Sequence, residues 1–199
     1  MLRQVYPRCI WHMPRNEKKV YLTFDDGPHP AVTPFILEQL RRVRAKATFF
    51  CLGKNVAAHP DLYTQILREG HSTGNHTYNH KNGWKTPDRE YLADIVAAAK
   101  VIDSNLFRPP YGRITPFQIR HLTDPVLNLH PIMWSILSGD FDPARSPEEC
   151  VENVVKPLRN GSIIVFHDSE KAMPNVTAAL PRVLDFLTER GYIMEKICI

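Results

Sequence analysis

A short β-rich run, a turn and an amphipathic helical stretch recur along most of this chain. The runs that predict strands are residues 20–24, 47–52, 71–75, 106–108, 131–137, 162–166 and 192–199. The stretches that predict helices are residues 33–44, 60–68, 86–102, 115–122, 146–158 and 174–190, the last broken or bent near Pro181. Strands that alternate with helices form a parallel sheet. Seven such units in 199 residues are too few for an eight-unit barrel of about 250 residues, so we predict a single α/β domain built as a distorted, seven-stranded (β/α) barrel.

Composition and charge narrow the class of protein. The 43% hydrophobic and 23% charged residues are typical of a soluble globular domain. The net charge is +4, but the basic residues are dispersed without a long stripe or a binding motif, so we expect no nucleic-acid partner. The four cysteines are far apart, which argues against a zinc ribbon or a dense disulfide framework, and no glycine-rich phosphate loop follows a strand.

The first residues precede the first predicted strand. We predict that residues 1–18 form an N-terminal extension that packs on a catalytic domain at residues 19–199. This segment has no apolar core of signal-peptide length, and no stretch of the chain approaches the roughly 20 apolar residues of a transmembrane span. We therefore expect a cytoplasmic protein, unless the sequence is a processed form of a secreted or cell-envelope protein.

Ionisable residues gather at the carboxyl ends of the predicted strands. They are Asp25 and Asp26, His76 and His80, Arg108, Asp140 and Asp142, and His167 and Asp168. In parallel barrels these strand ends meet at one rim, where active sites are built, so side chains from distant parts of the sequence are expected in one pocket. Chance placement in surface loops would not favour one end of the strands so consistently.

The sequence HTYNH places His76 and His80 four residues apart, which on a helical turn would put both imidazoles on one side. Taken alone, such a pair is more often two surface histidines. Together with the aspartates at the same rim, it predicts a metal site of two histidines and one carboxylate with an open position. Zinc suits these ligands, and Co²⁺, Ni²⁺ or Fe²⁺ could occupy them as well.

Asp25 and Asp26 are adjacent, and only one of them is needed as a metal ligand. The other is then free to take a proton from water that the metal activates. Adjacent side chains of a regular strand point to opposite faces of the sheet. Both aspartates therefore reach one pocket only if the chain turns, and Gly27 and Pro28 are expected to provide that turn.

Three further residues are candidates for the chemistry of amide hydrolysis. His167 is a suitable proton donor for the departing amine. Arg108 could hold the free aspartate in its ionised form. Asp140 could pair with Arg108 or with His167, or it could form only a structural salt bridge.

Five segments carry a resemblance to a known family. They are TFDDGP at 23–28, HTYNH at 76–80, RPPYG at 108–112, SGDFD at 138–142 and IIVFH at 163–167. In order and spacing they resemble the five motifs of the polysaccharide deacetylases with a NodB-homology domain, which form carbohydrate esterase family four. The resemblance covers about residues 20–199. It implies a distorted seven-stranded barrel that removes N-acetyl, or sometimes O-acetyl, groups from sugar polymers with a divalent metal, usually zinc.

The resemblance also implies roles for the residues at the centre of the site. Asp25 is the expected general base, and Asp26 is expected to bind the metal together with His76 and His80. Arg108 is expected to orient the base. The choice between the two adjacent aspartates therefore comes from the resemblance.

The remaining roles that the resemblance implies concern the acid and the pocket wall. The backbone N–H of Tyr111 is expected to help hold the oxyanion, and Asp140 is expected to support His167 as the acid. Val165 is expected to line the pocket for the acetyl methyl group. Two residues depart from the family pattern, because Phe141 stands where tryptophan is usual and Val165 where leucine is usual. Both changes affect the pocket wall, and with it the preference for the acyl group and the sugar.

We therefore expect a metal-dependent hydrolase that acts on peptidoglycan, a chitin-like oligomer or another acetylated glycan. One alternative is an intracellular deacetylase or deformylase of a small or lipid-linked amino sugar, which the missing signal peptide favours. A second alternative is a carbohydrate-binding protein without turnover, against which the complete set of base, ligands, arginine and acid argues. Outside the motifs, Trp84 either stacks on a sugar ring or is buried on the barrel exterior.

Overall fold

Strands and helices alternate along the chain in the computed structural model, which describes residues 6–199. The first five residues of the predicted N-terminal extension lie outside the described residues. The strands are β1 (Lys19–Asp25), β2 (Ala47–Cys51), β3 (Ser72–Asn75), β4 (Leu106–Phe107), β5 (His130–Pro131), β6 (Ile136–Leu137), β7 (Ile163–His167) and β8 (Ile193–Met194). The helices are α2 (Val32–Arg42), α3 (Gly53–Ala58), α4 (Pro60–Arg68), α5 (Asp88–Ala99), α6 (Pro116–Leu122), α7 (Pro147–Val155) and α8 (Met173–Glu189), with short 3-10 turns η1 (Pro110–Gly112) and η2 (Glu170–Ala172).

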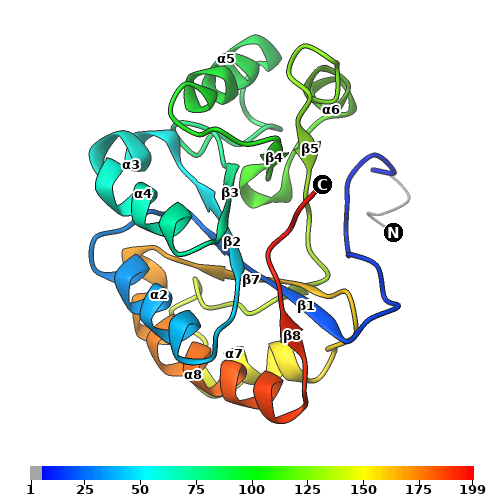
Figure 1. Cartoon of the computed structure of the whole chain (residues 1–199). Coiled ribbons are helices and arrows are strands. Elements are labelled where there is room, and N and C mark those ends of the chain that lie inside the picture. Colours follow the sequence, from blue (N-terminus) through cyan, green and yellow to red (C-terminus); the bar gives the residue numbers. More distant parts are fainter. Residues whose placement is uncertain (1–5) are drawn as a thin grey trace.

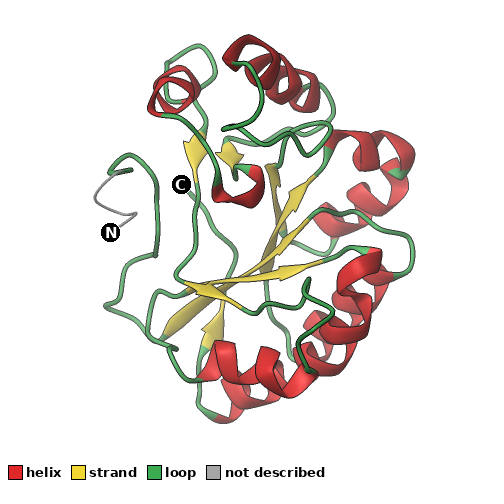
Figure 2. Ribbon diagram, turned by 180° about the vertical axis from the view of Figure 1, so that it is seen from behind, coloured by secondary structure: helices red, strands yellow, loops and turns green. Residues whose placement is uncertain are grey.

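The strands form one curled parallel sheet. Seven of them follow the order β5-β4-β3-β2-β1-β7-β6, and the short β8 pairs with the start of β1. The helices cover the outside of the sheet around most of its curve, while the N-terminal segment lies on the side that loops leave open (Figures 1 and 2). The predicted fold class, a distorted seven-stranded (β/α) barrel, is therefore confirmed.

Four details differ from the expected elements. The closing strand expected at 192–199 is only Ile193–Met194, because the chain pairs with β1 over two residues and Ile197 then bonds to the Thr48 side chain and not to a strand backbone. The run at 131–137 is divided into β5 and β6, because the residues between them pair with other parts of the chain. Helix α3 was not predicted, since its six residues are too few to show a helical period. Helix α8 continues through Pro181, and buried residues on both sides of the proline, Leu180 and Val183 among them, hold it on the core.

Strand β1 lies at the centre of the sheet and is buried on both faces. Its alternate residues Val20, Leu22 and Phe24 join the core cluster beneath helices α2 and α8. The intervening residues point the other way, into the barrel interior, where Tyr21 joins a second apolar cluster. By the same alternation Asp25, the last residue of β1, faces the interior, so the strand itself positions this carboxylate.

Both ends of the described chain help to close the barrel. The N-terminal segment pairs Ile10 with Ile132 between β5 and β6. The C-terminal segment runs from β8 past the strands (Figure 1), and the backbone N–H of Ile197 donates to Thr48 Oγ1 at 2.9 Å. The apolar cluster of the barrel interior comprises Tyr21, Phe50, Leu106, Ile132, Ile163 and Ile197. The expected division of the chain at residues 18 and 19 stays a prediction.

Within residues 6–199, no helix is both long enough and apolar enough to cross a membrane. The observation says nothing about the compartment. The expected cytoplasmic location therefore stays a prediction.

The C-terminal segment offers a matched test of barrel closure. Ile197 is 1% exposed and Ile199 is 52% exposed, so the two isoleucines differ in burial but not in chemistry. We expect Ile197→Ala to lower the free energy of unfolding by roughly 3 kcal/mol, because it removes buried methyl groups and leaves a cavity. Ile199→Ala should change it by less than about 0.5 kcal/mol. Urea denaturation followed by circular dichroism measures both, and equal losses would contradict the role assigned to Ile197.

Candidate active site

A cavity of about 680 Å³ lies at the carboxyl ends of the strands. Most of the predicted site residues line it, namely Asp25, Asp26, His76, His80, Tyr111, Phe141, Val165 and His167. The other two, Arg108 and Asp140, are fully buried and contact lining residues from behind. The structure therefore brings these ten predicted site residues together in one place, whereas Asp142, also at a strand end, does not line the cavity and lies beside Arg145.

The chain turns at Asp26, which is how two adjacent aspartates reach one cavity. Asp26 has a left-handed φ of 84°, a conformation that aspartate adopts more easily than most residues. Its N–H donates to the Phe50 carbonyl at 3.2 Å, and its own carbonyl accepts from Asn55 Nδ2 at 2.7 Å. The expected turn is present, but it starts one residue before Gly27 and Pro28. Asn55, on the unpredicted helix α3, gave no signal in the sequence.

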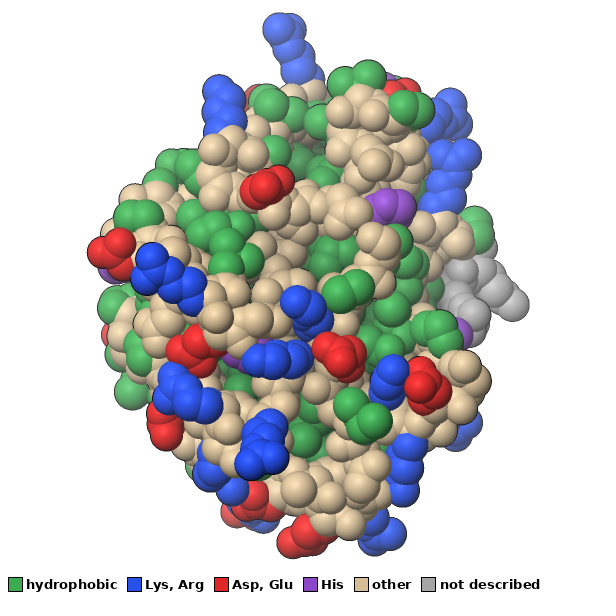
Figure 3. Space-filling view, viewed as in Figure 1, with side chains coloured by type: hydrophobic (Ala, Val, Ile, Leu, Met, Phe, Trp, Pro, Cys, Tyr) green, Lys and Arg blue, Asp and Glu red, His purple; other side chains and the backbone are tan. Residues whose placement is uncertain are grey.

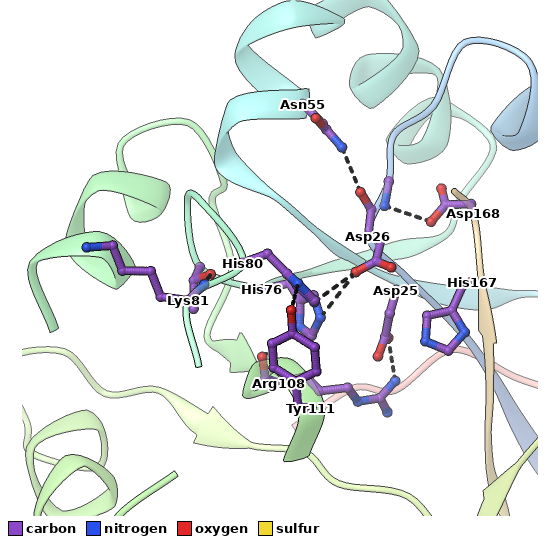
Figure 4. A network of polar contacts seen from close by, with 12 residues as sticks. Asp25, Asp26, Asn55, His76, His80, Lys81, Arg108, Tyr111, His167 and Asp168 are labelled. Atoms are coloured by element: carbon purple, nitrogen blue, oxygen red, sulfur yellow. Dashed lines mark hydrogen bonds and ion pairs between the residues drawn. The ribbon is translucent and has the colours of Figure 1, made fainter. Parts of the chain in front are cut away.

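Three side chains converge on one point from β1 and the loop after β3. The Oδ1 atom of Asp26 lies 3.1 Å from Nε2 of His80 and 3.6 Å from Nε2 of His76 (Figure 4). Bonds of about 2.0–2.1 Å to a tetrahedral ion put ligand atoms about 3.3 Å apart, between these two values. The same Oδ1 atom is buried and has no hydrogen-bond partner. An orphaned carboxylate oxygen facing two ring nitrogens fits a divalent cation.

The outer nitrogens of both histidines are held by the protein. Nδ1 of His76 lies 2.7 Å from the Arg108 carbonyl, so it carries the proton and leaves the Nε2 lone pair toward Asp26. Nδ1 of His80 lies 3.1 Å from the hydroxyl of Tyr111. Burial lowers the pKa of His76 to about 4, which keeps its imidazole neutral, as a metal ligand must be.

The spacing predicted that the two histidines lie on one helical turn, and this prediction is wrong. They lie in a loop, and two of its residues have left-handed φ values of 66° and 60°. Asp94 of helix α5 holds this loop, because its Oδ2 accepts from the backbone N–H groups of Tyr78 and Asn79, each at 2.9 Å. In the sequence, the only signal of Asp94 was an acidic residue on the apolar face of a predicted helix. Sequence reasoning missed it.

Arg108 holds Asp25 in place. Its Nη1 atom donates to Asp25 Oδ1 at 2.7 Å and to Thr23 Oγ1 at 2.6 Å. The Nε and Nη2 atoms donate to the carbonyls of Ile132 and Met133 at 3.1 and 3.0 Å. Burial lowers the pKa of Arg108, but the charge of Asp25 opposes this and a guanidinium stays protonated at neutral pH. The expected pairing of Arg108 with the first aspartate is therefore present.

Asp140 pairs with His167 and not with Arg108, which decides between the alternatives left open by the sequence. Its Oδ1 lies 2.8 Å from His167 Nδ1, and its Oδ2 accepts the backbone N–H of His167 at 2.7 Å. Burial alone would lower the pKa of His167. The charge and hydrogen bond of Asp140 outweigh burial and raise that pKa to about 9, so the imidazole is protonated at neutral pH.

The pocket wall is apolar near this acid. The ring of Phe141 lies edge-on to His167 with centroids 5.0 Å apart, and Val165 is aligned with Leu137 between β6 and β7. Tyr111 is exposed on the rim and has a left-handed φ of 60°. Trp84 is 54% exposed, so the alternative in which it is buried is wrong.

Asp168 is a further residue whose contacts the sequence did not show. Its Oδ1 accepts the N–H of Gly27 at 2.9 Å, and its Oδ2 accepts from Thr33 Oγ1 at 2.7 Å. A Cβ atom on residue 27 would lie 1.9 Å from Asp168, so only glycine allows this approach. Burial raises the pKa of Asp168 well above its usual range. The only signal in the sequence was its position directly after His167.

Comparison with known proteins agrees with this geometry. The sequence model of the polysaccharide deacetylase family matches residues 12–122. The chain belongs to that family. The resemblance carried by the five motifs is therefore confirmed, and membership makes this protein a carbohydrate esterase-type hydrolase that acts on carbon–nitrogen bonds other than peptide bonds. The family depends on a divalent metal, for which Asp26, His76 and His80 are the candidate site.

Individual relatives cover nearly the whole chain. The chain is 37% identical over 188 residues to a peptidoglycan-N-acetylglucosamine deacetylase of Bacillus cereus, across 92% of this chain and 87% of that protein. It is 34% identical over 201 residues to a chitooligosaccharide deacetylase of Azorhizobium caulinodans, across 92% of this chain and 94% of that protein. A crystal structure of a peptidoglycan N-acetylglucosamine deacetylase superposes with a TM-score of 0.89 at 30% identity, covering 98% of this chain and 93% of that chain.

The two adjacent aspartates provide a matched test of the metal site. We expect the protein to bind one divalent ion, and Asp26→Asn to weaken binding of Zn²⁺ by about 100-fold, because it removes the charged ligand while keeping the shape. Asp25→Asn should bind Zn²⁺ within a few-fold of the unaltered protein, since Asp25 pairs with Arg108. Isothermal titration of the metal-free proteins measures both constants. Equal weakening in the two variants would contradict the assignment of Asp26 as the ligand.

Proposed function

We propose that this protein is a divalent-metal-dependent N-deacetylase of glycans that contain N-acetylglucosamine. The observation that carries the proposal is the meeting, in one cavity, of the Asp26, His76 and His80 cluster with Asp25 and His167 beside it (Figure 4). The named relatives act on peptidoglycan and chitooligosaccharides, which supports an acetylated glycan as the substrate. A deformylase and a binding protein without turnover are not favoured, because the relatives are deacetylases and every group needed for hydrolysis is present.

Asp26, His76 and His80 would hold the ion. Zn²⁺ suits two imidazoles and a carboxylate best, and Co²⁺, Ni²⁺ or Fe²⁺ suit them as well. When bound, such an ion supplies a Lewis acid that polarises the acyl carbonyl and makes water more acidic. The protein prepares these ligands in advance. Burial raises the pKa of Asp26, but the surrounding histidines outweigh this and hold it below its usual range, so the carboxylate is ionised.

Asp25 is the proposed base. One oxygen, Oδ1, accepts from Arg108, which fixes the plane of the carboxylate. The other oxygen, Oδ2, has no hydrogen-bond partner among residues 6–199. It is available to accept a proton from a water molecule as the oxygen of that water bonds to the carbonyl carbon of the acetamide.

His167 is the proposed acid. Its Nδ1 atom is engaged by Asp140, which leaves Nε2 to donate its proton to the sugar nitrogen as the carbon–nitrogen bond breaks. Acetate and an amino sugar are the products. The backbone N–H of Tyr111 is the proposed donor to the oxygen that gains negative charge, and Val165 and Phe141 line the wall near the acetyl methyl group.

Removal of the base tests the proposed function. In Asp25→Asn the amide oxygen can still accept from Arg108, so we expect the fold and the bound metal to be retained while kcat for acetate release falls at least about 100-fold. Acetate released from N-acetylglucosamine oligomers and from peptidoglycan fragments is measured, and circular dichroism and metal analysis serve as checks. Full activity in this variant would overturn the role of Asp25, and no acetate from any glycan with the unaltered protein would overturn the function.

The pH profile of kcat tests the acid. His167 must be protonated to donate, so activity falls as pH rises through its pKa, which Asp140 raises to about 9. In Asp140→Asn the negative charge is lost and that pKa falls, so the alkaline limb of the profile should move to lower pH. The control Asp142→Asn changes an exposed acid two residues away and should leave the limb in place. An unmoved limb in Asp140→Asn would show that His167 is not the titrating acid.

A further inference from the structure

The wall of the catalytic cavity includes three cationic side chains, Lys54, Arg113 and Lys171. Lys54 lies at the start of α3 after β2, Arg113 follows β4, and Lys171 lies in the short turn η2 after β7. Because these three strands are not neighbours in the sheet, the cations are spread along the rim and are not clustered at one point. We call them the cationic rim.

The charges of the cationic rim are not neutralised by the protein. None of the three side chains forms a salt bridge within residues 6–199, and residues 1–5 contain no acidic residue. The two acids that line the cavity have other partners, since Asp25 pairs with Arg108 and Asp26 faces the two histidines. The opening of the cavity is therefore positively charged.

Some basic side chains elsewhere on the surface pair with acids, as in Arg42–Asp185 and Arg182–Glu148, each at 2.7 Å. On the face shown in Figure 3, basic and acidic side chains are interspersed. Unpaired basic side chains occur elsewhere on the surface too, Lys100 among them, so the rim is distinguished by the placement of three such cations around one cavity.

Two of the three cations lie over aromatic rings. The guanidinium carbon of Arg113 is 5.4 Å from the ring centroid of Trp84, whose indole nitrogen donates to the Ile114 carbonyl at 3.0 Å. Nζ of Lys171 is 6.0 Å from the ring centroid of Phe141. Such contacts attract a cation without using its N–H groups. The side-chain N–H groups of Arg113 have no acceptor within residues 6–199, so they are available to a ligand.

We propose that the cationic rim binds carboxylate groups of the substrate, so that this enzyme prefers an acidic glycan to a neutral oligosaccharide. The proposal rests on the proposed deacetylase function and specifies its substrate class. A cavity with charge of one sign attracts ligands of the opposite sign, and a guanidinium binds a carboxylate through two parallel hydrogen bonds. A neutral oligosaccharide lacks the negative charge that the rim attracts. Each sugar that has already lost its acetyl group carries an ammonium ion, which the rim repels.

The test compares substrates that differ only in charge. Glycan strands of peptidoglycan carry carboxylates on their peptide stems or, once the peptide is removed, on the lactyl groups of the sugar, so both forms are used. Each is also converted to its methylamide, which removes the charge and keeps the sugars. We expect kcat/KM for acetate release to be about tenfold higher for at least one acidic form than for its amide at low salt, and the ratio to approach one at about 1 M salt, where charges are screened within about 3 Å. The form with the larger ratio identifies the source of the carboxylate.

Variants of the rim locate the effect. Arg113→Gln should lower the ratio of acidic to amidated substrate by about threefold, as expected for one partly exposed ion pair, and the triple variant Lys54→Gln, Arg113→Gln and Lys171→Gln should bring the ratio near one. Lys100→Gln removes an exposed lysine that does not line the cavity and should leave the ratio unchanged. A general loss of activity lowers kcat/KM for both substrates equally. The ratio of acidic to amidated substrate therefore reports only the loss of charge recognition.

Two failures are distinguishable. Equal kcat/KM for acidic and amidated glycans would overturn the carboxylate-binding rim while leaving the deacetylase function intact. A ratio that survives in the triple variant would also overturn it, because another group would then recognise the charge. Absence of acetate from every substrate would instead overturn the proposed function on which the rim depends.

Discussion

The guanidinium of Arg108 lies inside the barrel with no exposure to solvent and donates four hydrogen bonds. Removal of a charge of this size from water costs several kcal/mol, and the cost is offset only where good acceptors surround it. Here the acceptors are Asp25 and Thr23 on β1 and two carbonyls on the segment after β5. The ring of Phe50 on β2 lies 4.0 Å from the guanidinium carbon. One side chain from β4 therefore joins four parts of the barrel and fixes the proposed base.

This interaction also accounts for the irregular side of the barrel. The carbonyls of Ile132 and Met133 accept from Arg108, and Met133 also donates its N–H to the carbonyl of Ile10 at 2.7 Å. Between β5 and β6 the backbone therefore bonds to a buried cation and to the N-terminal segment. A regular strand at 131–137 would have to give up these bonds, and the chain forms two short strands instead.

The alternation of strands and helices, and the polar residues at strand ends, were sufficient to predict the barrel and the meeting of the site residues. Local pattern could not show how the histidines meet, because their loop depends on left-handed residues and on Asp94, a distant acceptor on α5. It also missed Asn55 and the contacts of Asp168, whose partners lie 29 and 141 residues away in the sequence. Spacing indicates which residues share an edge of the sheet, but the backbone conformation between them decides which atoms face each other.

Three carboxylates crowd the end of β1, and each is accommodated in a different way. Asp25 pairs with the buried cation Arg108, Asp26 faces two imidazoles, and Asp168 has no cation among its hydrogen-bond partners. Burial raises the pKa of Asp168, whose two oxygens accept hydrogen bonds from Gly27 and Thr33. Asp168 supports the turn through its hydrogen bond from the N–H of Gly27. The unpartnered oxygen of Asp26 faces the two imidazoles, whereas Oδ2 of Asp25 is left on the cavity wall, where a base for water is required.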